Sequence, residues 1–233
     1  VTDPENPVLP AQDVKGTVEF DHVSFAYPEA GENVLTDISF KAEKGETIAV
    51  IGSTGSGKST LINLIPRFYD VTKGRVLVDG VDVRDMTQRE VRDRLGYVPQ
   101  RGILFSGTID SNIRYGKTDI SAEEVKEAAE VAQATEFIDT KPETYNSPIA
   151  QGGTNVSGGQ KQRLSIARAI AKKPEIFIFD DSFSALDFKT DSTLRKALKA
   201  HTKDATTIIV AQRISTILNA DKIIVLDDGH MAG

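Results

Sequence analysis

The sequence predicts an α/β fold with a mainly parallel sheet, an antiparallel β subdomain near the N-terminus and an inserted helical subdomain. Short apolar runs alternate with segments of helical periodicity along the 233 residues, which is the pattern of a parallel sheet covered by helices. Asp79-Gly80 lies between two apolar runs within residues 75–83 and indicates a hairpin. Residues 101–173 carry mainly helical patterning, so we assign them to the inserted subdomain.

The first residues differ from the rest of the chain. Residues 1–13 contain three prolines and little hydrophobic patterning, so we interpret them as a linker that precedes a domain over 14–233. Residues 17–25 then alternate between apolar and polar side chains, which predicts a half-buried strand.

The parallel sheet is predicted from short apolar runs of strand length. They cover residues 47–51, 176–179, 207–211 and 222–226. A helix is predicted over 59–65, ended by Pro66. In the inserted subdomain, Ser121 and Glu124 form a capping box for a helix that runs to Phe137, and a second helix covers 158–172.

Composition limits the possible functions. The chain has no cysteine, which excludes disulfides and thiolate metal sites. Its net charge of −6 disfavours general nucleic-acid binding, so we expect no nucleic-acid partner. No apolar run approaches the ~18–20 residues that a membrane helix requires.

A glycine-rich segment fits the phosphate-binding pattern G-x-x-x-x-G-K-[ST]. It reads Gly52-Ser-Thr-Gly-Ser-Gly57-Lys58-Ser59 and lies between a predicted strand and a predicted helix. The glycines let backbone N–H groups converge on phosphate oxygens. Lys58 would reach the β and γ phosphates, and the Ser59 hydroxyl would bind Mg²⁺. The sequence therefore predicts a P-loop NTPase core.

The run Ile176-Phe-Ile-Phe-Asp180 places an aspartate directly after a buried strand. An aspartate in this position can hold Mg²⁺ beside a phosphate loop. Alone it is more often an ordinary strand-end residue, but its place downstream of the phosphate loop favours the metal role for Asp180.

Residues 156–160 contain a further glycine-rich motif, which resembles the signature of a known family. Val156-Ser157-Gly158-Gly159-Gln160 resembles the LSGGQ signature of ABC ATPases, with valine for leucine, and residues 161–169 continue the resemblance. The motif opens a predicted helix, whose N-terminal amides can bind a phosphate. The resemblance, which covers residue 14 to the C-terminus, implies that this motif binds ATP held by a facing ABC domain.

Other segments resemble the family in sequence order. The resemblance implies that Tyr27 stacks on adenine, that Gln100 contacts Mg²⁺ and the attacking water, and that Ser184–Asp187 crosses the dimer interface. The expected ATP-binding residues are Tyr27, Gly52, Ser53, Thr54, Gly55, Ser56, Gly57, Lys58, Ser59, Thr60, Ser157, Gly158, Gly159 and Gln160. The expected metal residues are Ser59, Gln100 and Asp180, and the expected catalytic residues are Lys58, Gln100, Asp181 and Gln212.

Residues 102–113 resemble the segment of ABC exporters that docks on the membrane domain. The resemblance implies a transmembrane domain, normally earlier on the same polypeptide, and a location at the cytoplasmic face of the cell membrane. We expect the proline-rich start to follow such a domain.

Two positions that process the γ-phosphate depart from the family pattern. Most active members have glutamate after the strand-end aspartate, whereas this chain has Asp181, whose carboxylate is shorter by about 1.5 Å. A general base displaced by that much can cost on the order of 100-fold in rate. The family's switch histidine, in V-A-H-R-x-S-T, is Gln212 within residues 210–216, and glutamine cannot gain a proton near neutral pH.

These departures predict a degenerate ATP site in a heterodimer, where the signature of this chain completes an active site on a different partner. A slow homodimer stays an alternative, as do a non-transport ABC ATPase and a regulatory module that binds ATP without turnover. A chromosome-maintenance ATPase would need a long coiled coil before the signature, but only about a hundred residues without sustained heptads separate Gly52 from Ser157.

Overall fold

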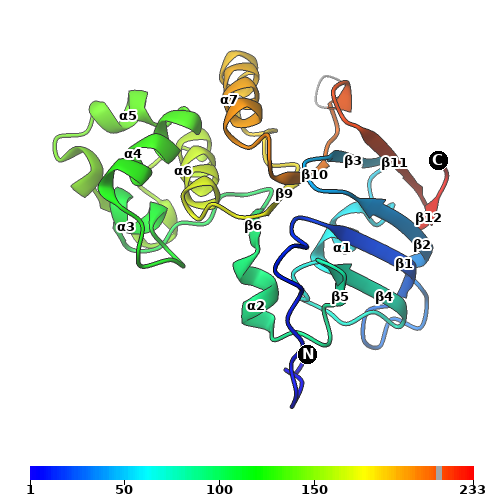
Figure 1. The fold of residues 1–233 in the computed structure, drawn as a ribbon. Helices are drawn as coiled ribbons and strands as arrows, with labels where there is room; N and C mark the ends of the chain where they lie inside the picture. The colour runs from blue at the N-terminus through cyan, green and yellow to red at the C-terminus, as the bar shows by residue number, and fades with distance from the viewer. Residues whose placement is uncertain (214–216) are drawn as a thin grey trace. The chain divides into compact units, whose positions relative to one another are not determined.

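The computed structural model describes residues 1–213 and 217–233, which divide into two compact units. Unit 1 comprises Val1–Leu95, Glu175–Asp180 and Asp204–Gly233, and unit 2 comprises Gly96–Pro174 and Asp181–Lys203. The first and last strands of the chain, coloured blue and red in Figure 1, therefore fold together in unit 1. Among the described residues, no helix combines the length and apolar character needed to cross a bilayer.

Unit 1 begins with an antiparallel sheet in the order β2-β1-β4-β5. Its strands are β1 (Val18–Phe25), β2 (Leu35–Ala42), β4 (Lys73–Val78) and β5 (Val81–Asp82). The expected hairpin is confirmed, because Asp79 and Gly80 both have positive φ angles, of 52° and 79°, between β4 and β5. This pair of angles suits a two-residue hairpin turn.

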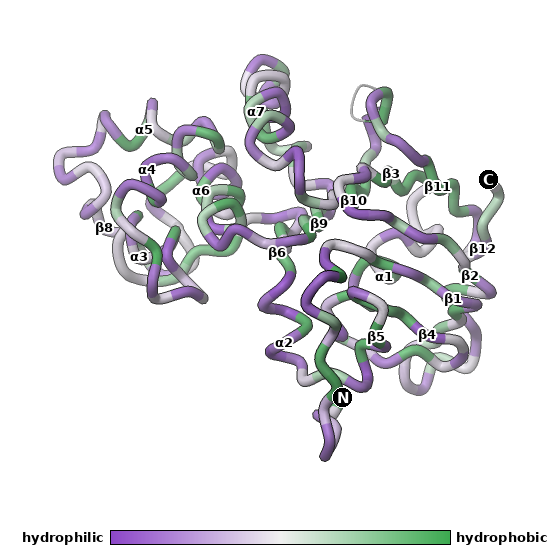
Figure 2. The backbone as a smooth tube through the Cα atoms, in the orientation of Figure 1, coloured by the Kyte–Doolittle hydropathy of each residue, from purple (hydrophilic) through white to green (hydrophobic). Residues whose placement is uncertain are grey.

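Five strands of the second sheet belong to unit 1, in the order β12-β11-β3-β10-β9. They are β3 (Thr47–Gly52), β9 (Ile176–Asp180), β10 (Thr206–Val210), β11 (Lys222–Asp227) and β12 (His230–Met231). All pairs are parallel except β11–β12, so the sheet is mixed, with every predicted parallel strand in place. Figure 2 shows hydrophobic colour along β11.

Helix α1 (Lys58–Asn63) begins at the end of the phosphate-loop segment, and α2 (Gln88–Asp93) lies near the end of the first part of unit 1, at Leu95. α1 stops two residues before the predicted end at Ile65. The N–H groups of Leu64 and Ile65 donate to carbonyls only three residues back, which tightens the chain into a turn ahead of Pro66.

Unit 2 is mainly helical and includes the range 101–173 that the sequence assigns to the helical subdomain. Its helices are α3 (Ile109–Ile113), α4 (Ala122–Val131), α5 (Thr135–Asp139), α6 (Gly158–Ala171) and α7 (Phe188–His201). The short elements of this unit are β6 (Leu95–Val98, which begins in unit 1), β7 (Gly107–Thr108), η1 (Thr144–Asn146), β8 (Pro148–Ile149) and η2 (Gln151–Gly153). Both α3 and α4 pack on α6, and α7 packs on α4.

The helix predicted to run from Ser121 to Phe137 is broken into α4 and α5, although its capping box is confirmed. Gln133 has a positive φ of 57°. The N–H groups of Gln133 and Ala134 donate to the carbonyls of Glu130 and Ala129, which is the Schellman pattern that ends a helix.

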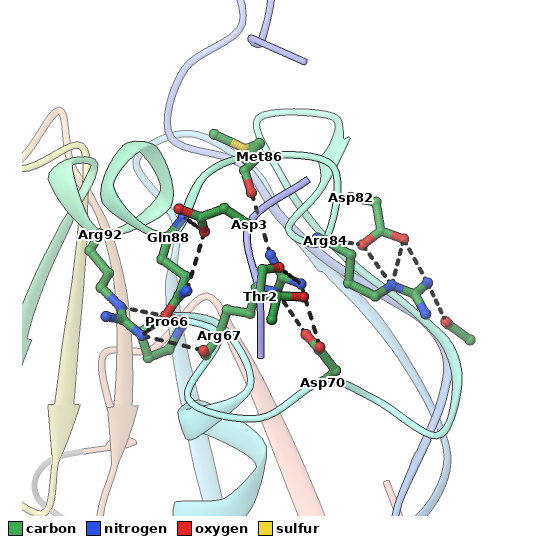
Figure 3. A network of polar contacts seen from close by, with 11 residues as sticks. Thr2, Asp3, Pro66, Arg67, Asp70, Asp82, Arg84, Met86, Gln88 and Arg92 are labelled. Carbon is green, nitrogen blue, oxygen red and sulfur yellow. Dashed lines mark hydrogen bonds and ion pairs between the residues drawn. The ribbon is translucent and has the colours of Figure 1, made fainter. Parts of the chain in front are cut away.

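Residues 1–17 contain no helix or strand but are hydrogen-bonded to the rest of unit 1 (Figure 3). The Arg67 guanidinium, which is buried, donates from Nη2 to the Thr2 carbonyl at 3.0 Å. The Gln88 backbone N–H donates to Asp3 Oδ1 at 2.9 Å, at the start of α2. Thr2 and Asp3 are therefore fixed to the residues that follow α1 and to α2.

Glu175, just before β9, gives unit 1 a pH-dependent stability. Burial, and then its hydrogen bond to the Asp79 carboxylate, raise the pKa of Glu175 to about 7. A folded-state pKa above the unfolded one means that the stabilisation is complete below pH ~4.5 and is lost as pH rises through about 7.

We therefore expect Glu175→Gln to stabilise the protein at pH 8 by on the order of 1 kcal/mol after solvent screening, and to have little effect at pH 4.5. Urea unfolding at both pH values measures the difference. The exposed Glu143→Gln serves as the control and should follow the wild type at both. An equal effect of Glu175→Gln at both pH values would contradict this account.

Candidate functional site

The carboxyl edge of the parallel sheet in unit 1 gathers several predicted site residues. In the register, Val210 of β10 lies opposite both Val50 of β3 and Asp180 of β9. Gly52 lies two residues after Val50, and Gln212 lies two residues after Val210. Both therefore lie at the same edge of the sheet as Asp180. Ligands of parallel α/β sheets bind at this edge.

The phosphate-loop segment, residues 52–59, is folded so tightly that two positions require glycine. Gly57 has a φ of 104°, and an added Cβ would lie 2.7 Å from Leu35 Cδ2. At Gly52 an added Cβ would lie 2.4 Å from the Leu226 carbonyl oxygen. Ser53, Thr54 and Gly55, at the crest of the loop, are exposed. The two glycines thus let the loop backbone pack closely against the rest of unit 1, while residues 53–55 are exposed to solvent.

Lys58 spans this loop from the first turn of α1. Its side chain is buried, and Nζ donates to the carbonyl oxygens of Gly52 and Ser53, each at 2.7 Å. A buried ammonium group needs such partners, since burying a charge without them is costly. The arrangement holds a positive charge against the backbone of the loop.

Ser59 and Asp180 are brought together, as the sequence predicts. The Ser59 hydroxyl donates to Asp180 Oδ1 at 3.1 Å. Hydroxyl and carboxylate oxygens are hard donors of the kind that Mg²⁺ prefers, usually with waters and phosphate oxygens in the other positions. The residues present therefore fit a magnesium ion beside the loop.

Tyr27 is hydrogen-bonded to α1, the helix that also carries Lys58 and Ser59. Its hydroxyl shares a hydrogen bond of 2.8 Å with the Thr60 hydroxyl. Its ring makes edge contacts with Phe25 at 4.9 Å and with Tyr69 at 5.2 Å between centroids. Sequence analysis missed Tyr69; the aromatic pair at positions 68 and 69, soon after Pro66, is the signal that could have found it.

In unit 2, Gln100 and Asp181 lie together. The Gln100 amide donates from Nε2 to Asp181 Oδ2 at 3.3 Å. Asp181 has a positive φ of 49°, which aspartate adopts more readily than most residues. The buried Ser182 hydroxyl donates to the Val98 carbonyl at 2.7 Å. This bond joins the chain next to Asp181 to the chain just before Gln100.

The signature motif begins α6 with a capping box. Ser157 Oγ accepts from the Gln160 N–H at 3.1 Å, and Gln160 Oε1 accepts from the Ser157 N–H at 3.1 Å. Because an α-helix cannot use its first N–H groups internally, the amides of Gly158 and Gly159 face away from the helix. The first turn carries no acidic residue. This helix start can accept an anion.

The segment Ser184–Asp187 lies beside that helix start. A Cβ at Gly159 would be 3.6 Å from the Ala185 carbonyl oxygen. Asp187 then caps α7, its Oδ1 accepting from the Thr190 N–H at 2.9 Å. Two segments expected at a dimer interface are thus neighbours within unit 2.

Comparison with known proteins identifies the family. A sequence model of the ABC transporter family matches residues 35–184. The chain belongs to the ABC transporter family. It is 49% identical over 228 residues to the putative multidrug export ATP-binding/permease protein YgaD of Bacillus subtilis, covering 98% of this chain and 39% of that protein. A putative multidrug export ATP-binding/permease protein of Staphylococcus aureus (strain NCTC 8325 / PS 47) is 48% identical over 222 residues, 95% of this chain and 38% of that protein.

The fold agrees with this family. The structure of a bacterial Atm1-family ABC exporter with ATP bound superposes with a TM-score of 0.93 and 40% identity, over 100% of this chain and 40% of that chain. The resemblance of the sequence to ABC ATPases is thus confirmed. The chain spans about two fifths of the length of these ABC proteins.

The position of the family's switch residue lies in unit 1 of this ABC domain. Gln212 is exposed and follows β10, and the adjacent Ala211 N–H donates to the Val50 carbonyl at 3.2 Å. Residues 214–216 of the same motif lie outside the described residues. Gln212 therefore follows the strand that pairs with the strand leading into the phosphate loop.

Proposed function

We propose that this chain is the ATP-binding and ATP-hydrolysing motor domain of an ABC exporter, and that its own site binds Mg²⁺ and ATP but hydrolyses slowly. The observation that carries the proposal is the contact of Ser59 with Asp180 beside a loop folded around the Lys58 ammonium group. This arrangement supports a metal position next to a phosphate position.

Each residue near the loop then has a role in binding. The amides of residues 52–59 and the Lys58 ammonium group bind phosphate oxygens. Ser59, Gln100 and Asp180 would hold Mg²⁺, which would neutralise charge on the phosphate oxygens when bound. Tyr27 supports the adenine by stacking, with its hydroxyl anchored on Thr60.

The hydrolytic step depends on Gln100, Asp181 and Gln212. Gln100 and Asp181 orient the attacking water, and Asp181 accepts its proton. Its short side chain places the carboxylate back from the position that glutamate would reach. Gln212 donates a hydrogen bond to the γ-phosphate without carrying charge. Binding is therefore preserved while proton removal and charge stabilisation are weakened.

The signature motif serves the partner domain. Because Ser157 Oγ accepts from Gln160, its own hydrogen remains to be donated, together with the amides of Gly158 and Gly159, to the γ-phosphate of a facing ABC domain. ATP would bridge the two domains and stabilise the dimer. We propose a partner chain with a consensus site, and a transmembrane domain, normally on the same polypeptide, that selects the transported substrate. The motor domain would lie at the cytoplasmic face of the membrane.

Calorimetric titration with ATP tests the proposal. We expect binding that requires Mg²⁺ and is lost in EDTA. Absence of Mg²⁺-dependent affinity at millimolar ATP would refute it. Single-turnover hydrolysis with and without a partner chain separates a motor from a regulatory module, since only a motor releases phosphate. Association with membranes through a covalently linked domain separates an exporter from a non-transport ABC ATPase.

A further inference from the structure

Gln162 is a buried polar residue on the second turn of α6, the helix that begins with the signature motif. Its side chain is 1% exposed, and Nε2 donates to the Pro99 carbonyl oxygen at 3.0 Å. Pro99 immediately precedes Gln100, the residue proposed to contact Mg²⁺ and water. The signature helix is thus bonded directly to the backbone that carries Gln100.

A second contact lies on the other side of Gln100. An added Cβ at Gly102 would lie 2.7 Å from the Lys161 carbonyl oxygen and 2.9 Å from Ser165 Oγ. The backbone at Gly102 therefore runs directly against α6, at the turn that contains Gln162. Gln100 lies between two points at which its own chain is fixed to the signature helix.

The side-chain amide of Gln162 also has an unfavourable effect on stability. Its Oε1 atom is buried and has no hydrogen-bond partner among the described residues. Leaving a buried acceptor unsatisfied is unfavourable, and an apolar side chain of the same length would avoid that penalty. The donor bond to Pro99 is the interaction that a glutamine at this position adds over such a side chain.

We infer that Gln162 is a positioning residue that fixes Gln100 relative to the signature helix, so that the start of α6 and the Gln100–Asp181 pair move together. The inference rests on the proposed function. ATP held by the partner domain against Ser157 would thereby set the placement of Gln100 at this chain's own site. The two nucleotide sites would communicate through one side chain.

The test uses Gln162→Met, which keeps the length of the side chain and removes the donor. Mn²⁺ is titrated against the assembled transporter in the presence of ATP, and electron paramagnetic resonance measures the free ion. We expect Mn²⁺ affinity at this chain's site to fall roughly 10-fold, as for loss of a group that orients a metal ligand. The control Ser147→Ala removes a buried polar group elsewhere in unit 2 and should leave Mn²⁺ affinity unchanged.

A double-mutant cycle with Gln100→Ala separates positioning from a general structural effect. If Gln162 acts through Gln100, then adding Gln162→Met to Gln100→Ala changes Mn²⁺ affinity no further. Equal losses in both backgrounds, or wild-type affinity for Gln162→Met alone, would overturn the inference. Should Gln162→Met not fold, Gln162→Asn gives the same comparison with a shortened amide. A wild-type protein without ATP-dependent Mn²⁺ binding would instead refute the proposed function.

Discussion

Replacing Asp181 by glutamate together with Gln212 by histidine should raise hydrolysis at this chain's own site by roughly 100-fold. Glutamate extends the carboxylate by about 1.5 Å toward the water, and histidine can carry positive charge beside the γ-phosphate. The phosphate-loop segment and Tyr27 are untouched, and histidine can still donate a hydrogen bond to the γ-phosphate in place of Gln212, so ATP affinity should stay near that of the wild type. The gain would therefore appear in the rate constant of the chemical step.

Single-turnover hydrolysis in the presence of a consensus partner measures this gain. Glutamate tolerates the positive φ at position 181 less well than aspartate, so thermal unfolding should accompany the assay. The exposed Asp93→Glu on α2 repeats the same chemical change away from the site and should leave the rate unaltered. An unchanged rate in a folded double variant would show that these two residues do not explain a slow site.

Replacing Gly158 by alanine should lower hydrolysis at the partner's site roughly 10- to 100-fold while leaving the fold intact. An added Cβ at Gly158 meets no atom within 4 Å, and alanine is more favourable than glycine in a helix by roughly 0.5–1 kcal/mol. The methyl group would, however, stand at the start of α6, where a phosphate has to approach the amides. The variant should thus be as stable as the wild type or more stable, and less active.

Thermal unfolding of the single chain and ATP turnover of the assembled dimer provide the two measurements. Glu123→Ala, an alanine substitution in the first turn of α4, is the matched control and should not alter turnover. Unchanged turnover in the Gly158→Ala assembly would argue that the signature helix of this chain does not meet the partner's ATP.

Local sequence signals predicted most of the elements. The hairpin at Asp79-Gly80 and the capping box of Ser121 were predictable because each depends on neighbouring residues. The break at Gln133 was not, because a Schellman end usually carries glycine and the sequence offers none there.

The same distinction applies to the candidate site. The phosphate-loop segment and the signature helix are contiguous motifs, so sequence alone located them. Tyr69 and Gln162 contact residues distant in the chain, Tyr27 and Pro99 respectively. No spacing rule encodes such contacts, and only the folded chain brings the partners together.

The hydrogen bonds made by Thr2 and Asp3 also matter for a shortened form of this protein. Trimming the protein to its first strand, at Val18, would delete the carbonyl that receives a hydrogen bond from Arg67 and leave a buried guanidinium short of an acceptor. The same truncation would also remove the Asp3 carboxylate, which accepts a hydrogen bond from the backbone N–H of Gln88. The hydrogen bonds that stabilise unit 1 therefore reach beyond its regular secondary structure.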